Sequence, residues 1–153
     1  MSRAKRAKEL FQQGYACSQA VALAFCDLTG VSEDEMKKLT LPFGGGLGRL
    51  RLTCGGVSGM AVIIGLLFSD EENSPENKKK VYAITQELSN RFKGENGSLI
   101  CADLLTGANL QVSVGGEAEK RTDEYYKKRP CAEIVYTAAK ILEEYLTEKG
   151  IIA

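Results

Sequence analysis

Residues 54–68 read CGGVSGMAVIIGLLF, and this stretch decides the fold. Its part from Val57 to Phe68 is the longest apolar run in the chain, and Gly59 and Gly65 interrupt it. The run is far shorter than the ~20 residues that a membrane-spanning helix needs. It therefore predicts a buried core helix, with Cys54 directly before the first turn.

The sequence on both sides of this run predicts further helices. Apolar residues recur at helical spacing, and Ser, Pro and Gly mark starts and stops. The expected helices cover residues 5–13, 17–29, 32–39, 75–92, 98–107 and 131–149. Residues 108–117 are expected to be a loop with a brief extended piece at Val112 and Val114, and the charged residues 117–128 allow a helix.

The chain shows neither an internal repeat nor a low-complexity linker. Residues 1–153 are therefore predicted to form one all-α domain. Its expected architecture is a single-domain helical bundle with a glycine-rich loop before the buried apolar helix.

The glycine-rich loop covers residues 41–49, which read LPFGGGLGR. So many glycines are incompatible with regular helix and favour positive φ or close backbone approach. The segment lacks the third glycine of the dinucleotide pattern and any Gly-Lys-Ser/Thr, so no nucleotide is expected. We expect the loop to bring Arg49, Arg51 and Cys54 to one place.

Composition excludes several classes of function. Twenty basic and twenty acidic residues cancel, which argues against nucleic acid or an anionic membrane as partner. The first residues contain no apolar core of a secretory signal, so a cytoplasmic protein is expected. Because there is no histidine, Cys-His and Ser-His catalysis, His-ligated zinc and a His-ligated haem are excluded.

After these exclusions, the cysteines are the remaining candidates for catalysis or for binding a cofactor. No Cys-x-x-Cys occurs, which excludes a thioredoxin-type motif, a zinc ribbon and c-type haem attachment. Four cysteines stand at predicted helix N-termini, where free N–H groups and the helix dipole favour thiolate. They are Cys17, Cys54, Cys101 and Cys131. Cys26 lies half a turn out of phase with Cys17 on the expected helix 17–29, so we interpret it as a packing residue.

Two interpretations of these four cysteines stay open at this stage. Their thiols are either buried structural groups near helix ends or a converging site, because long sequence intervals do not show convergence. The same holds for Arg49 and Arg51, which either stabilise a thiolate or an anionic cluster or are simply solvated.

Several motifs together resemble one family. The segments are GYACSQA at 14–20, FGGGLGR at 43–49 and CGGVSG at 54–59, followed by single Cys101 and Cys131. They resemble the redox-active C_GCAxxG_C_C family over about residues 5–146. Two positions depart from it, since Gly56 replaces the usual alanine and Arg51 stands where glycine is expected.

The resemblance implies an all-helical fold and a redox role. The family is also similar to the helical, non-haem part of split-Soret cytochromes, in which a [2Fe–2S] cluster is associated with cysteines. Carried over residue by residue, the metal ligands implied here are Cys17, Cys54, Cys101 and Cys131, without Cys26.

Four functional hypotheses follow. The first is an electron-transfer protein that binds an iron–sulfur cluster of the [2Fe–2S] type through the four thiolates, with Arg49 and Gly55 at the cofactor. The second is a metal-free thiol–disulfide redox protein with Cys54 and Cys17 as catalytic residues. The third is a protein that binds zinc or another soft metal without catalysis, and the fourth is a structural or partner-binding helical domain. A redox partner is implied but not identified, and an exposed apolar helix face allows a homodimer.

Overall fold

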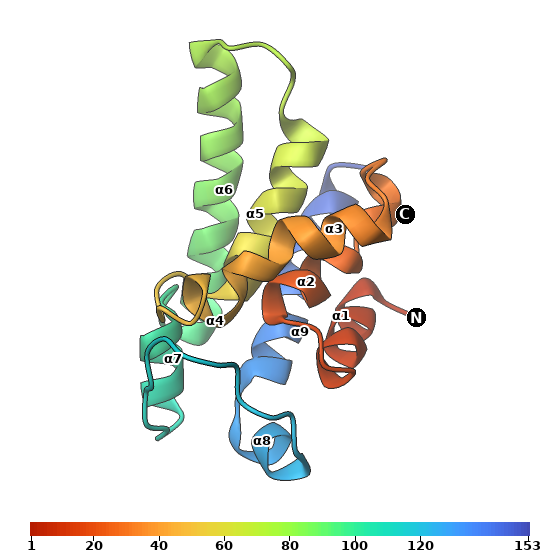
Figure 1. The fold of residues 1–153 in the computed structure, drawn as a ribbon. Coiled ribbons are helices and arrows are strands. Elements are labelled where there is room, and N and C mark those ends of the chain that lie inside the picture. Colours follow the sequence, from red (N-terminus) through yellow and green to blue (C-terminus); the bar gives the residue numbers. More distant parts are fainter.

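The computed structural model describes residues 1–153 and confirms the prediction of an all-α single-domain fold (Figure 1). The α-helices are α1 (Arg3–Gln12), α2 (Cys17–Leu23), α3 (Glu33–Thr40), α4 (Gly44–Leu47), α5 (Gly55–Phe68), α6 (Pro75–Asn96), α7 (Cys101–Gly107), α8 (Asp123–Lys128) and α9 (Cys131–Glu148). Short 3-10 helices cover Cys26–Leu28 and Leu41–Phe43. None of these helices combines the length and the apolar character that crossing a membrane requires.

The core lies where α1, α2, α5 and α9 pack together. The apolar stripe expected on the last helix is confirmed, because all six of its residues are buried: Ile134, Val135, Ala138, Ile141, Leu142 and Tyr145. Burying one large apolar side chain contributes roughly 1.5–3 kcal/mol. The four-helix core is therefore the main source of stability.

A close helix crossing in the core joins α2 to α5 at Gly59. A Cβ atom at Gly59 would lie 2.6 Å from the Ser18 carbonyl oxygen and 3.2 Å from the Val21 Cβ. Ser18 is fully buried at this crossing, and its hydroxyl donates a 2.7 Å hydrogen bond to the Thr40 carbonyl oxygen. Only glycine lets the two backbones approach this far, so Gly59 sets the spacing between α2 and α5.

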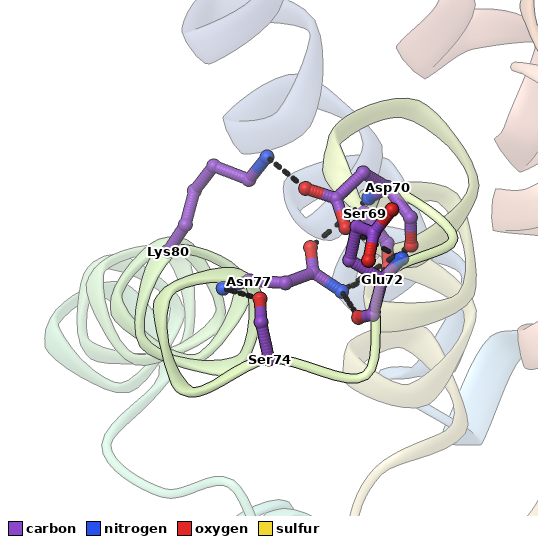
Figure 2. A network of polar contacts seen from close by, with 6 residues as sticks. All are labelled: Ser69, Asp70, Glu72, Ser74, Asn77 and Lys80. Atoms are coloured by element: carbon purple, nitrogen blue, oxygen red, sulfur yellow. Dashed lines mark hydrogen bonds and ion pairs between the residues drawn. The ribbon is translucent and has the colours of Figure 1, made fainter.

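The antiparallel pair α5 and α6 extends away from the rest of the molecule (Figure 1). Asn77 closes the turn between them: its Oδ1 accepts a hydrogen bond from the Asp70 N–H, and its Nδ2 lies 3.2 Å from Ser69 Oγ (Figure 2). Lys80 Nζ lies 3.7 Å from the Asp70 carboxylate in the same network. Burial of the apolar helix is confirmed as far as Ile64, which is 1% exposed, whereas Leu66 in the last turn is 40% exposed.

The predicted helix 17–29 is wrong in its second half. α2 ends at Leu23, and the backbone leaves helical geometry at Phe25 (φ −117°, ψ 4°) before a 3-10 turn that contains Cys26. Cys26 Sγ donates to the Val31 carbonyl oxygen, and Thr29 Oγ1 donates to the Cys26 carbonyl oxygen. These local bonds replace the helical pattern. Cys26 is still a buried packing residue, 4% exposed, as expected.

Smaller differences concern the helix around Cys101 and the segment after it. Ser98 does not cap this helix, because the N-cap is Ile100; the Ser98 hydroxyl accepts from the Ile100 N–H and donates to the Asp103 carboxylate. The expected extended piece at Val112 and Val114 forms no strand, and residues 108–122 make a long connection. In the charged segment 117–128, only Asp123–Lys128 is helical.

The α2–α5 crossing generates a stability prediction. Gly59→Ala should lower the free energy of unfolding by about 1–3 kcal/mol, because the added methyl group overpacks the contact with Ser18. The matched control is Gly65→Ala in the same helix, where an added Cβ meets no atom within 4 Å. That variant should raise stability by about 0.5–1 kcal/mol through helix propensity. Urea unfolding followed by circular dichroism measures both, and equal effects of the two substitutions would contradict the close-crossing interpretation.

Candidate functional site

One cavity of about 310 Å³ lies where the N-termini of α2, α5, α7 and α9 meet. All six site residues expected from the sequence line this cavity: Cys17, Cys54, Cys101, Cys131, Arg49 and Gly55. Cys26 is not among the lining residues. The helix-terminus prediction is confirmed for the four cysteines, since Cys54 is the N-cap of α5 and the other three are first residues of their helices.

Backbone pairing brings Cys54 and Cys101 to the same wall. An isolated antiparallel bridge joins Thr53 to Ile100. On either side of it, the Cys54 N–H donates to the Leu99 carbonyl oxygen at 2.7 Å, and the Cys101 N–H donates to the Leu52 carbonyl oxygen at 2.6 Å. The bridge therefore positions two cysteines that are far apart in sequence.

Glycines make room for the cysteines around the cavity. A Cβ atom at Gly55 would lie 2.3 Å from Cys17 Sγ, which is far below any contact distance. A Cβ atom at Gly46 would lie 2.7 Å from the Cys101 Cβ and from the Leu52 nitrogen. A side chain at either glycine would displace a cysteine or its backbone support. Position 55, directly after Cys54, therefore requires glycine, because Cys17 Sγ occupies the space that a side chain there would need.

The glycine-rich loop adopts a conformation that regular helix does not allow, as predicted. The backbone φ is positive at Gly45, Gly46 and Gly48 and also at Leu47, Arg49 and Arg51. The loop folds back on itself, because the Arg51 N–H donates to the Gly45 carbonyl oxygen at 3.1 Å. A non-glycine residue in the left-handed region costs roughly 1–2 kcal/mol. Three such residues lie between positions 47 and 51. Backbone strain of this kind is retained where the placement of the side chains matters more than the free energy that the strain costs.

The charged residues of the cavity wall are four arginines and a single acid. The arginines are Arg49, Arg51, Arg121 and Arg129, and the acid is Glu119. Glu119 forms ion pairs with Arg129 and with Arg51, the latter at 4.0 Å. The hydrogen bond from Arg129 holds the pKa of the Glu119 carboxyl below its ordinary value, so this acid carries its charge. The wall therefore has a surplus of positive charge.

The connection of residues 108–122, here called the strap, crosses this wall. The Gly115 N–H donates to the Arg49 carbonyl oxygen at 2.9 Å, and Arg49 Nη1 donates to the Glu117 carbonyl oxygen. Arg51 Nε donates to the Ser113 carbonyl oxygen at 2.9 Å. Because Gly116, Ala118 and Glu119 of the strap line the cavity, the arginines of the glycine-rich loop hold one of its walls in position.

Arg121 fixes the end of the strap against α1. Its guanidinium lies 4.3 Å from the Phe11 ring centroid and 5.0 Å from the Tyr125 ring centroid. It also donates hydrogen bonds to the carbonyl oxygens of Phe11 (3.1 Å) and Tyr15 (3.2 Å). Stacking of a guanidinium on aromatic rings is favourable, and Arg suits it better than Lys. Burial raises the pKa of Tyr125 to about 12, so its phenol is neutral.

Three of the four cavity cysteines have thiols with raised pKa values. Burial raises the pKa of Cys54 well above its ordinary value and that of Cys131 to about 12, and the charge of Cys17 adds to both shifts. Burial also raises the pKa of Cys17. The backbone N–H groups of Gly45 near Cys17 and of Gly56 near Cys54 act in the opposite direction, because each lowers the pKa of its cysteine and favours thiolate. Burial is the larger effect, so the thiols of Cys17, Cys54 and Cys131 are neutral in the metal-free protein.

The side chains as placed do not enclose a single metal ion. No group of three or more Cys, Asp or Glu side chains has the geometry to hold one. The four cysteines instead line one cavity. This arrangement suits a group of several atoms more than one ion, because one tetrahedral ion draws its four sulfurs to about 2.3 Å from itself.

Sequence reasoning did not find Arg121, Arg129, Glu119 and Tyr125. Arg129 had a signal in the sequence, since it stands two residues before Cys131, the first residue of α9. The other three come from the strap and α8, whose path over the cavity depends on tertiary contacts.

Comparison with known proteins agrees with this geometry. The family model described as "Putative redox-active protein (C_GCAxxG_C_C)" matches residues 15–145, which is most of the chain. No match was found among the curated proteins or among the solved structures. The matched residues contain the four cavity cysteines and the glycines that make room for them. The chain therefore belongs to the C_GCAxxG_C_C family.

Proposed function

We propose that this redox-active protein transfers electrons by means of an iron–sulfur cluster, of the [2Fe–2S] type, held in the cavity by Cys17, Cys54, Cys101 and Cys131. The observation that carries the proposal is the presence of all four cysteines on the walls of one cavity of about 310 Å³. Cysteine thiolates are the usual ligands of such clusters, and four suffice. When bound, the cluster supplies a centre that accepts and releases one electron at a time.

The shape of the site supports a cluster over a single ion. Zinc bound by four cysteines forms a closed site, with every sulfur at about 2.3 Å from the metal. No three potential ligands here have the geometry to hold one ion, whereas the cavity has room for a larger group. The zinc hypothesis therefore becomes an alternative outcome of the experiment below.

The charge of the wall also supports the proposal. A cluster with four thiolate ligands is an anion, because four thiolates and two sulfides outweigh two ferric ions. The cavity offers four arginines against the single Glu119. With neutral thiols this surplus of positive charge has no counterpart, and an anionic centre offsets most of it.

Backbone N–H groups serve the same purpose at individual sulfurs. The backbone N–H groups of Gly45 and Gly56 lie near Cys17 and Cys54, and each lowers the pKa of its cysteine. When each thiol releases its proton from Sγ on ligation, these donors stabilise the sulfur that remains. Hydrogen bonds to ligand sulfurs are also one of the factors that set a cluster's reduction potential.

Metal-free thiol–disulfide exchange finds less support. That chemistry needs an attacking thiolate, so its catalytic cysteine normally has a lowered pKa. Burial and neighbouring thiols instead raise the pKa of Cys54, the nucleophile expected in this hypothesis, and burial raises that of Cys17. Both therefore suit a role as metal ligands, for which the bound iron takes over the stabilisation of the thiolate.

The first prediction tests the cofactor. Protein prepared without oxygen and supplied with iron and sulfide should be brown, with about two iron and two sulfide per chain. Cys17→Ser, Cys54→Ser, Cys101→Ser and Cys131→Ser should each reduce iron and sulfide content and change the visible spectrum. Iron and sulfide analysis together with absorbance spectra measures this.

The matched control is Cys26→Ser, which changes the fifth cysteine and keeps a group that donates to the Val31 carbonyl oxygen. It should keep the wild-type iron content. Circular dichroism shows whether each variant is folded. One zinc per chain in colourless protein would support the zinc hypothesis, and unchanged iron in all four ligand variants would disprove the site.

A second prediction concerns the thiols of the metal-free protein. Because a raised pKa keeps a thiol protonated at higher pH, Cys54 and Cys131 should react slowly with iodoacetamide at pH 8, and their rates should keep rising up to about pH 12 for Cys131. Mass mapping of alkylated peptides measures each rate.

The urea-unfolded chain is the reference, because its cysteines titrate near the ordinary value of about 8.5 and react fully at pH 9. Rapid alkylation of Cys54 in the folded protein at pH 7 would contradict the raised pKa and favour thiol–disulfide exchange.

A further inference from the structure

Arg51 differs from the other cavity arginines in its contact with a cysteine. Its Nη1 lies 3.7 Å from Cys101 Sγ, within hydrogen-bonding range for sulfur. The same guanidinium donates through Nε to the Ser113 carbonyl oxygen at 2.9 Å and has Glu119 at 4.0 Å from Nη2. One planar group thus contacts a cysteine, the strap and the only acid of the cavity.

The backbone conformation and the burial of Arg51 both cost free energy, which indicates that its side chain has a function. Its backbone φ is +61°, in the region that glycine prefers, and its charged side chain is 8% exposed. Both the backbone conformation and the burial of charge cost free energy. Neighbouring backbone fixes it, because the Arg51 N–H donates to the Gly45 carbonyl oxygen and its own carbonyl oxygen accepts from the Ala102 N–H.

We propose that Arg51 is a positioning residue that places a guanidinium N–H on the Cys101 sulfur and thereby raises the reduction potential of the bound cluster. This inference rests on the proposed function. One electron taken up from a reductant adds one negative charge, which is shared by the ligand sulfurs. A positive N–H donor on one of those sulfurs stabilises the reduced form more than the oxidised form.

The strap explains why the guanidinium stays at the sulfur. The bond from Nε to the Ser113 carbonyl oxygen fixes the plane of the group, so that Nη1 points to Cys101. Lysine carries the same charge but has no rigid fork, so it cannot hold Ser113 and Cys101 together. The role therefore belongs to the geometry of arginine as well as to its charge.

Variants at two control positions distinguish the effect of the Arg51–Cys101 contact from the effects of backbone strain and of positive charge alone. Leu47 has φ +71° in the same loop and carries no charge, so Leu47→Gly removes strain and a partly exposed apolar side chain without changing the charge. Arg49 has φ +64° and lines the cavity, but it donates to the Glu117 carbonyl oxygen and contacts no cysteine sulfur. Arg49→Gly therefore removes strain and one positive charge without removing a bond to a ligand.

The experiment measures the midpoint potential of the reconstituted holoprotein by titration with dithionite at pH 7. Arg51→Gly should shift the potential to a more negative value, Arg49→Gly should shift it less, and Leu47→Gly should leave it unchanged. Arg51→Gly should still fold, because glycine adopts φ +61° without strain. An unchanged potential in Arg51→Gly, or an equal shift in Arg49→Gly, would overturn the proposal.

A second arm uses the metal-free protein and does not depend on the cluster. Glutamyl endopeptidase cleaves after Glu117 and Glu119 in the strap, and Arg51→Gly should increase the cleavage rate there several-fold relative to Leu47→Gly. Equal rates would show that Arg51 does not hold the strap, which would overturn the geometry. A wild-type protein that binds no iron would instead disprove the proposed function and with it the effect on the potential, leaving the cleavage result to decide the position of Arg51.

Discussion

The close contact between the start of α5 and the start of α2 is the constraint on which the rest of this structure depends. Gly59 lets α5 approach the Ser18 backbone, and Gly55 leaves the space that Cys17 Sγ occupies. With a Cβ atom at either position the two helices would separate. Because Cys54 directly precedes Gly55, the same contact sets the distance between two of the four cysteines.

The remaining two cysteines reach the cavity by different means. Cys101 is placed by backbone pairing of residues 52–54 with residues 99–101, where Thr53 and Ile100 form a bridge. Cys131 is placed by the apolar face of α9, whose buried residues pack into the core. Hydrogen bonds of the loop and hydrophobic packing of the bundle therefore converge on one site. Such a site is stiff, because each cysteine is held by a structure that the fold requires in any case.

Charge gives the cavity its chemical character. Four arginines against one acid give the cavity wall a surplus of positive charge. Three of the arginines also contact the strap: Arg49, Arg51 and Arg129. The proposed cluster would offset most of this charge, and the strap would cover it. The same arginine side chains therefore supply the positive charge of the site and hold the strap against it.

The sequence alone determined the fold class, most of the helices and the cysteines to consider. Helix ends, glycines and apolar spacing are local signals, so they placed Cys17, Cys54, Cys101 and Cys131 at helix starts correctly. The helical pattern of residues 17–29 failed before Cys26, where hydrogen bonds of Cys26 and Thr29 replace it, and the segment with Val112 and Val114 forms no strand. Only the tertiary structure decided that the four cysteines share one cavity and that Arg121 and Glu119 border it. The physical reason is that side chains more than a hundred residues apart, such as Arg121 and Phe11, meet through the packing of whole helices, which no local pattern records.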